Sequence, residues 1–210
     1  CVMSIVTYNN RSIANISAIP GAAKSLTHIK TLTASSSSTL SFVDGSSDVV
    51  LDSTYPIYLF KFINIHPANN NVYFEINFST DSGSNYNVTK TTTVFDAFHY
   101  ENDGGNNLQY IGSRDLAQST SNATIEFISN QNDQSCSGFL HLFNPSSSTF
   151  VKHFMSVGND SWLDGSNAVS QNVYTAGYGN TTSPIDAVRF TVSSGNIDSG
   201  TIKLYGIKDS

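Results

Sequence analysis

The chain has 210 residues, 39% of them hydrophobic and 11% aromatic, which is enough for one well-filled core or two small ones. Only 12% are charged, against about 25% in an ordinary soluble domain, and the net charge is −6. This negative balance excludes nucleic acid as the expected partner, because binding to phosphates requires a positive field. No stretch approaches the roughly 20 apolar residues of a helical membrane span, so we expect no membrane insertion.

The first 24 residues are mostly small and polar, and they end in Ile19-Pro20-Gly21-Ala22-Ala23. Because Pro-Gly breaks regular structure, residues 1–24 are predicted to form an extended arm or linker. Residues 25–210 are predicted to form one β-sandwich domain. An arm without a core of its own is expected to pack on a neighbouring protein.

From Leu26 onward, apolar and polar residues alternate in short runs that are typical of strands. The predicted strands before the last 30 residues are 26–32, 39–43, 55–65, 72–78, 88–100, 139–143 and 150–157. The run 55–65 is apolar at almost every position, which indicates a central strand covered on both sides. The only helical candidate is short, at 113–118.

The last stretch, 185–207, contains two alternating runs around Ser194-Gly195-Asn196. Val188, Phe190 and Val192 share one face of the first run, and Gly195 permits a positive φ in the turn. The pattern predicts a hairpin that closes the domain. Roughly nine to eleven short strands, separated by turns every ten residues or so, indicate an all-β, jelly-roll-like β-sandwich.

Cysteine and histidine give little sign of a metal site. Cys1 and Cys136 are predicted to be free thiols, and two thiols cannot form a structural zinc site. His141 and His153 lie on opposite arms of a predicted hairpin, where they either bind a divalent ion or are ordinary strand residues. The run 81–85 partly matches a calcium loop but lacks the closing glutamate, so a plain turn explains it equally well. No cofactor and no metal are predicted.

The run 158–165 contains the single tryptophan of the chain between Asn and Asp residues. Sugars stack on aromatic rings and hydrogen-bond to such side chains, so the candidate glycan-binding residues are Trp162, Asp160, Asp164 and Tyr178. The alternative is that Trp162 plugs the open end of the sandwich or a subunit interface.

Catalytic patterns are weak. Glu101 and Asp103 are a pair of carboxylates beside glycines, but a pair two residues apart in a loop is usually a solvated turn. No Gly-x-Ser-x-Gly nucleophile elbow is present. The chain is therefore predicted not to be an enzyme.

Four blocks of the sequence, in order, resemble the tail-fibre-like C-terminal module of tailed-bacteriophage virion proteins. The blocks are 52–68, 78–86, 137–146 and the ending Ser194-Gly195-Asn196-Ile197-Asp198-Ser199-Gly200-Thr201-Ile202-Lys203-Leu204-Tyr205-Gly206-Ile207. The resemblance spans residues 25–210. It implies a structural or adhesive virion component, often at the end of a fibre and often trimeric, and it implies no enzyme activity and no binding residues.

The expected function is thus that of a phage virion protein, located on the tail fibre or capsid surface. The leading hypothesis is a homotrimeric fibre or receptor-binding tip, joined to other virion proteins through the arm and contacting a host-surface glycan. The alternatives are a capsid-bound fibre or decoration protein, a glycan-degrading tailspike, and a non-viral carbohydrate-binding module.

Overall fold

The computed structural model describes residues 25–208, which contain twelve β-strands and no helix. The first six strands are β1 (Leu26–Thr33), β2 (Thr39–Val43), β3 (Ile57–Pro67), β4 (Val72–Ser79), β5 (Lys90–Tyr100) and β6 (Asn106–Tyr110). The remaining six are β7 (Ala123–Ile128), β8 (Cys136–Phe143), β9 (Lys152–Asp164), β10 (Asn167–Gly179), β11 (Ala187–Val192) and β12 (Ile197–Ile207). The predicted arm, 1–24, lies outside the described residues.

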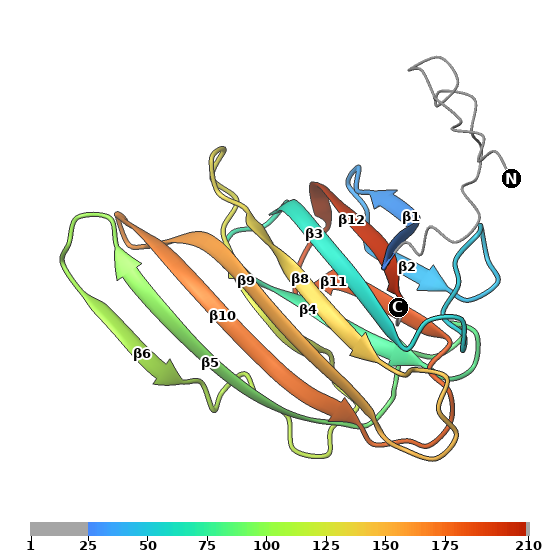
Figure 1. Cartoon of the computed structure of the whole chain (residues 1–210). Coiled ribbons are helices and arrows are strands. Elements are labelled where there is room, and N and C mark those ends of the chain that lie inside the picture. Colours follow the sequence, from blue (N-terminus) through green and yellow to red (C-terminus); the bar gives the residue numbers. More distant parts are fainter. Residues whose placement is uncertain (1–24, 209–210) are drawn as a thin grey trace, which may run out of the picture.

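The strands form two antiparallel sheets packed face to face (Figure 1). The larger sheet has eight strands in the order β1-β12-β3-β8-β9-β10-β5-β6, and the smaller has four in the order β2-β11-β4-β7. Four neighbouring strands of the larger sheet, β1-β12-β3-β8, pack on the smaller sheet, β2-β11-β4-β7. Together these eight strands have the strand order of a jelly roll. The other four strands, β9-β10-β5-β6, extend the larger sheet on one side. The predicted all-β, jelly-roll-like sandwich is confirmed.

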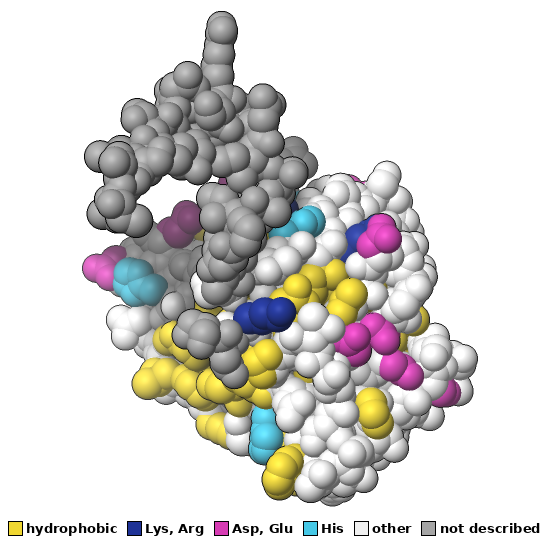
Figure 2. Space-filling view, turned by 45° about the vertical axis from the view of Figure 1, so that its right-hand side comes forward, with side chains coloured by type: hydrophobic (Ala, Val, Ile, Leu, Met, Phe, Trp, Pro, Cys, Tyr) yellow, Lys and Arg dark blue, Asp and Glu magenta, His cyan; other side chains and the backbone are white. Residues whose placement is uncertain are grey.

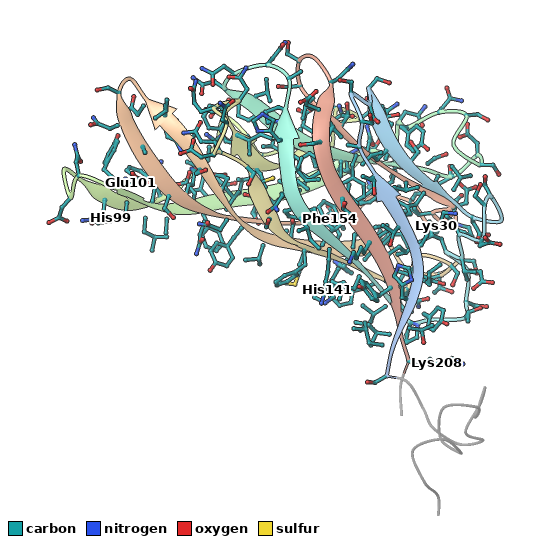
Figure 3. All side chains as sticks on the ribbon, turned by 90° about the horizontal axis from the view of Figure 1, so that it is seen from above. Lys30, His99, Glu101, His141, Phe154 and Lys208 are labelled. Atoms are coloured by element: carbon teal, nitrogen blue, oxygen red, sulfur yellow. The ribbon has the colours of Figure 1, made fainter. Side chains whose placement is uncertain are left out.

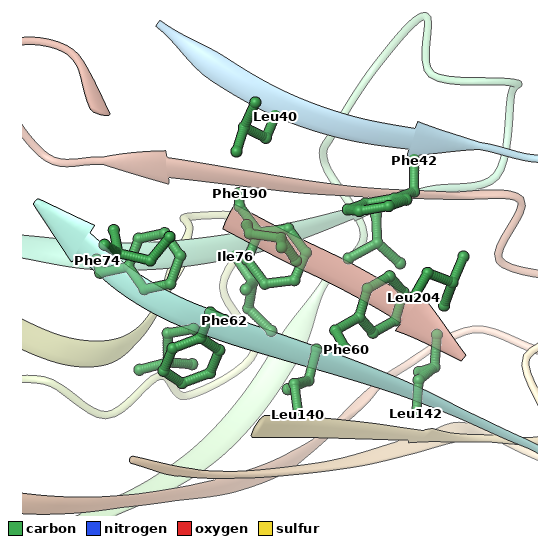
Figure 4. Packing of buried hydrophobic residues seen from close by; sticks show 14 of the residues in the cluster. Leu40, Phe42, Phe60, Phe62, Phe74, Ile76, Leu140, Leu142, Phe190 and Leu204 are labelled. Carbon is green, nitrogen blue, oxygen red and sulfur yellow. The ribbon is translucent and has the colours of Figure 1, made fainter. Parts of the chain in front are cut away.

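The core between the sheets is rich in phenylalanine (Figure 4). Phe42, Phe60, Phe74 and Phe190 have no exposed surface, and they come from both sheets. Their rings contact one another edge-on or offset, with centroids 5.3 Å apart for Phe42 and Phe60 and 5.5 Å apart for Phe60 and Phe190. Such pairs contribute about 0.5–1.5 kcal/mol beyond the area that they bury. The predicted alternation is confirmed for Phe74 and Phe190, which are buried together with the residues predicted to share their faces.

The C-terminal hairpin was predicted wrongly. β11 belongs to the four-stranded sheet and β12 to the eight-stranded sheet, so the chain crosses between sheets at Ser194-Gly195-Asn196. Gly195 adopts the expected positive φ, at 75°. Two strands that alternate in the same way bury their apolar faces equally well when they face each other across a core. The pattern therefore fixed the two strands and the turn, but not their pairing.

Two smaller predictions also need correction. Residues 113–118 form turns rather than a helix, because Leu116 N donates to Thr92 Oγ1 and Thr92 N donates to Leu116 O, which ties this segment to β5. The run 158–165 is mostly strand rather than loop, since β9 continues to Asp164. The tight turn follows at Asp164–Asn167, where β9 and β10 pair without a break.

Candidate functional site

The side of the eight-stranded sheet that is turned away from the four-stranded sheet is called here the outer face. Along β3, Tyr58, Phe60 and Phe62 point inward and are fully buried. The side chains that alternate with them on the outer face are Ile57, Leu59, Lys61 and Ile63, of which Leu59 is also buried. Ile63 is 38% exposed. No element among residues 25–208 covers this face. The prediction that 55–65 is covered on both sides therefore holds only for its inner side within the described residues.

The cross-strand pairing places apolar residues of neighbouring strands next to those of β3 on the outer face. One row runs Tyr205, Leu59, His141, Met155 and Ala176 through β12, β3, β8, β9 and β10. A second row runs Phe139, Val157, Tyr174, Phe95 and Tyr110 through β8, β9, β10, β5 and β6. Cross-strand neighbours of this kind lie about 4.5–5.5 Å apart and pack directly. The outer face is thus one continuous surface built by five or more strands.

Aromatic stacking makes part of this surface rigid. The rings of Phe95 and Tyr174 lie parallel with centroids 4.8 Å apart. His141 packs between Phe139 and Phe143, at 5.3 and 6.0 Å. Figure 3 shows His141 pointing away from the interior and Phe154, on the neighbouring strand, lying inside the sandwich. Partial burial lowers the pKa of His141, so this side chain is neutral at pH 7 and adds no charge to the face.

Exposed large hydrophobic side chains concentrate on this sheet. All but Phe150 of those found among the described residues lie on its strands: Leu26, Ile63, Phe95, Leu108, Tyr110, Phe139 and Met155. In Figure 2 hydrophobic side chains gather on one part of the surface, with a basic side chain and histidines beside them. Single exposed hydrophobic residues are normal, but a continuous patch marks a contact surface.

A hollow of about 450 Å³ lies on the outer face and crosses β8, β9, β10 and β5. Its walls are mainly apolar, and its lining side chains include Thr91, Phe143, His153, Met155, Ala176 and Tyr178. Exposed Phe150 lies three residues before His153, in the loop at the same end of the sheet. The hollow is therefore part of the apolar patch and not a separate polar site.

A polar hollow of about 420 Å³ lies beside the loop between β7 and β8. It is lined by Asn64, His66, Asn132, Asp133, Gln134, Ser135 and Ser199. The strands beneath it are irregular, because β3 shifts register between Phe62 and Ile65 and Asn64 adopts a φ of 50°. Bulges of this kind redirect side chains and are frequent beside functional sites. His66 Nδ1 lies 2.8 Å from Gln134 O, which holds the loop against β3.

The structure separates the four predicted glycan-binding residues. Asp160 is 1% exposed and points into the sandwich, so the prediction that it contacts a glycan at the surface is wrong. Trp162 also points inward and packs edge-on against Phe127, with ring centroids 5.1 Å apart, which matches the alternative that it plugs the end of the sandwich. Asp164 is exposed and accepts a hydrogen bond of 2.6 Å from Tyr100 Oη.

Tyr178 lies on the outer face, next to His153 across the β9–β10 pair. Trp162 pairs with Val169 of β10, and Tyr178 lies nine positions further along that strand, which corresponds to roughly 30 Å. The predicted set therefore does not form one surface, because Asp160 and Trp162 lie on the inward side of β9, whereas Tyr178 lies on the outer face at the far end of β10.

The other candidate sites have simpler explanations. Asp81 accepts hydrogen bonds from Asn85 N at 2.8 Å and from Ser79 Oγ at 2.7 Å, so its turn is complete without calcium. His141 is paired with Met155 rather than His153, so the two histidines do not face each other. Among residues 25–208, no group of three or more His, Cys, Asp or Glu side chains has the arrangement of a metal site. Cys136 is a buried free thiol, and Cys1 lies outside the described residues.

Two features of the structure were missed by the sequence reasoning. The first is the outer face, for which the apolar character of 55–65 on both sides was the available signal. The second is a buried carboxyl pair, Glu126 and Asp160, for which the sequence gives no signal, since acidic residues are usually exposed.

Comparisons with known proteins give no relative for this chain. No family model matches it, and no curated protein or solved structure matches it either. Within residues 25–208, no helix has the length and apolar character needed to cross a membrane.

Proposed function

We propose that this chain is a non-enzymatic structural protein of a tailed-phage virion, which self-associates through its outer face. The observation that carries the proposal is the continuous apolar surface across five strands, which no described element covers. Burying such a surface against another copy is favourable at about 25 cal/mol per Å². The low charge of the chain favours the same use, because few charged groups would lose water in the contact.

Two further points support the virion assignment. Jelly-roll sandwiches are common in viral structural proteins and lectins, although a fold alone does not determine function. The four sequence blocks that resemble phage tail-fibre-like modules cover the same residues that form the sandwich. A non-enzymatic role also fits the two carboxyls that approach each other, since Glu126 and Asp160 lie inside the sandwich, out of reach of a substrate.

The oligomer is testable with the full-length chain by size-exclusion chromatography with multi-angle light scattering. We expect a homotrimer, and we expect Met155→Asp to shift it toward monomer, because a carboxylate would be buried in the apolar contact. Thr39→Asp adds the same charge to an exposed position of β2, in the other sheet, and should leave the mass unchanged. A monomeric wild-type chain would contradict self-association, and equal effects of the two substitutions would contradict the outer face as its surface.

The location in the virion is testable by cryo-electron microscopy of purified particles, traced to the level of this chain. Threefold density at the distal tail is expected for a fibre or receptor-binding tip. Density on the capsid would instead assign the chain to a head fibre or decoration protein. Absence of the chain from the particles, checked by mass spectrometry, would contradict the virion assignment.

Glycan binding is a second candidate function, and the polar hollow beside the β7–β8 loop favours it. Carboxylate, amide, hydroxyl and imidazole groups converge there, and these groups hydrogen-bond to sugar hydroxyls. A glycan array probed with the wild-type chain and with Asp133→Ala tests this role, with Asp48→Ala as an exposed control away from the hollow. Binding that Asp133→Ala and Asp48→Ala leave equally intact would place the glycan elsewhere.

A further inference from the structure

The two sheets meet through a pair of buried carboxyl groups on one side of the sandwich. Glu126 comes from β7 of the four-stranded sheet and has no exposed surface. Asp160 comes from β9 of the eight-stranded sheet and is 1% exposed. The Glu126 carboxyl packs against Gly158. A Cβ added to Gly158 would lie only 1.8 Å from Glu126 Oε1. The absence of a side chain at Gly158 thus creates the space that the carboxyl occupies.

Too few hydrogen-bond donors reach the pair for both groups to be ionised. Asp160 Oδ2 accepts a bond of 3.0 Å from Phe127 N, but Asp160 Oδ1 and both Glu126 oxygens have no donor among residues 25–208. An ionised carboxylate without donors is very costly in the interior, and two of them side by side also repel each other. A proton held between the two carboxyls removes their repulsion and leaves a single buried charge, because one group then donates to the other.

The nearby charged groups do not replace this proton. The guanidinium of Arg114, from the β6–β7 segment, lies over the rings of Tyr73 and Phe127, and its Nη1 is 3.9 Å from Asp96 Oδ2 on β5. Asp96 also accepts a hydrogen bond from Gln171 Nε2 of β10. Among the described residues, Arg114 thus forms an ion pair with Asp96 and with neither carboxyl of the Glu126–Asp160 pair. From β8, the buried thiol of Cys136 pairs in register with Asp160 and is uncharged, since burial and the two carboxyls raise its pKa.

We propose that a proton shared by Glu126 and Asp160 holds β7 against β9, and that loss of this proton loosens the contact between the two sheets. The sandwich then has a pH-sensitive joint at the end that Trp162 closes. Phe127 connects the two features, because its amide donates to Asp160 and its ring packs against Trp162.

The pKa values of the pair agree in direction with this geometry. Burial, followed by the charge of Asp160, raises the pKa of Glu126 well above its usual range. Burial raises the pKa of Asp160 to about 7, against the lowering effect of the Phe127 amide. A carboxyl exposed by opening has a pKa near 4, so the closed form binds more protons than the open form above that pH. Closure is therefore strongest below about pH 4 and weakens as the pH rises from there through about 7 and above.

Trp162 is the single tryptophan of the chain, so its fluorescence reports on this joint alone. For the full-length chain we expect its emission to change between pH 5 and 8. We also expect hydrogen exchange of the β7 amides, corrected for intrinsic rates, to accelerate about tenfold per pH unit between pH 5 and 7.

Glu126→Gln keeps the size of the side chain but removes the titrating proton, so it should reduce this pH dependence strongly. Glu101→Gln changes an exposed carboxyl in the same way and should behave like the wild type. If Glu126→Gln does not fold, Asp160→Asn provides the same comparison, and failure of both to fold leaves the wild-type exchange profile to decide. A flat wild-type profile, or a transition that Glu126→Gln or Asp160→Asn leaves unchanged, would overturn the proposal.

Discussion

Several charged residues are buried in the structure, although the sequence pattern predicts that they are exposed. Lys90 has no exposed surface, although an alternating strand with a lysine at its start is normally interpreted as solvent-facing at that position. Its Nζ donates to Asn77 Oδ1 at 2.6 Å and to Val88 O at 2.7 Å. Glu126 and Asp160 were missed for the same reason. Such burial depends on partners that are distant in the sequence, which a local pattern does not contain.

The titration of Lys90 gives a prediction at this scale. Burial, with a smaller effect from Arg189, lowers the pKa of Lys90 to about 8. An exposed lysine has a pKa near 10.4, so the unfolded chain binds more protons between pH 8 and 10.4 and stability rises across that window. The difference corresponds to about 3 kcal/mol. Between pH 7.5 and 10, the slope of the free energy of unfolding against pH, measured with urea, should therefore be more positive for the wild type than for Lys90→Met, while the raised pKa of Cys136 acts in the opposite direction in both.

A matched substitution controls for the loss of a positive charge as such. Lys30→Met removes a lysine from the edge strand β1, where the side chain is only partly buried. Its stability should rise with pH as steeply as that of the wild type. An equally steep rise in Lys90→Met would show that Lys90 is not the group responsible.

Single strands were predicted well because burial on one face imposes a two-residue period. The run 72–78 became β4, with Val72, Phe74, Ile76 and Phe78 buried as predicted. Pairing was harder, because β11 and β12 have the alternation of a hairpin and yet lie in different sheets. The outer face was missed because 55–65 was assumed to be covered within its own domain. Neither the sheet of a strand nor the partner of a face is encoded in its period.

Core packing by β11 gives a prediction for this element. Phe190 is fully buried and its ring contacts Phe42, Phe60 and Phe74. Phe190→Ala should lower the free energy of unfolding by about 3–5 kcal/mol, through lost burial and the cavity that remains. Phe150 is 69% exposed, so Phe150→Ala should cost less than about 0.5 kcal/mol. Urea denaturation followed by circular dichroism measures both, and similar costs would contradict the described core.

The proposed assembly determines how the whole molecule should respond to salt. The outer face is mainly apolar, with Lys61 and Lys203 beside each other on β3 and β12, and the chain carries few charges, so self-association depends on apolar burial more than on ion pairs. Raising NaCl from about 0.05 to 1 M shortens the Debye length from roughly 14 to 3 Å, which would weaken a contact held by surface charges. Sedimentation equilibrium should show a dissociation constant that changes by less than roughly threefold over this range. Dissociation into monomers at high salt would indicate an electrostatic interface instead.

The order of the strands also has a consequence for synthesis on the ribosome. β1 pairs with β12, β2 pairs with β11, and β3 takes β12 as one of its two neighbours. β1, β2 and β3 therefore wait for β11 and β12, and neither sheet is complete until these two strands have been made. Contacts so distant in sequence slow folding, and they leave unpaired strand edges exposed while the chain is growing. A cell that makes this protein needs to keep the nascent chain from aggregating until β11 and β12 have left the ribosome.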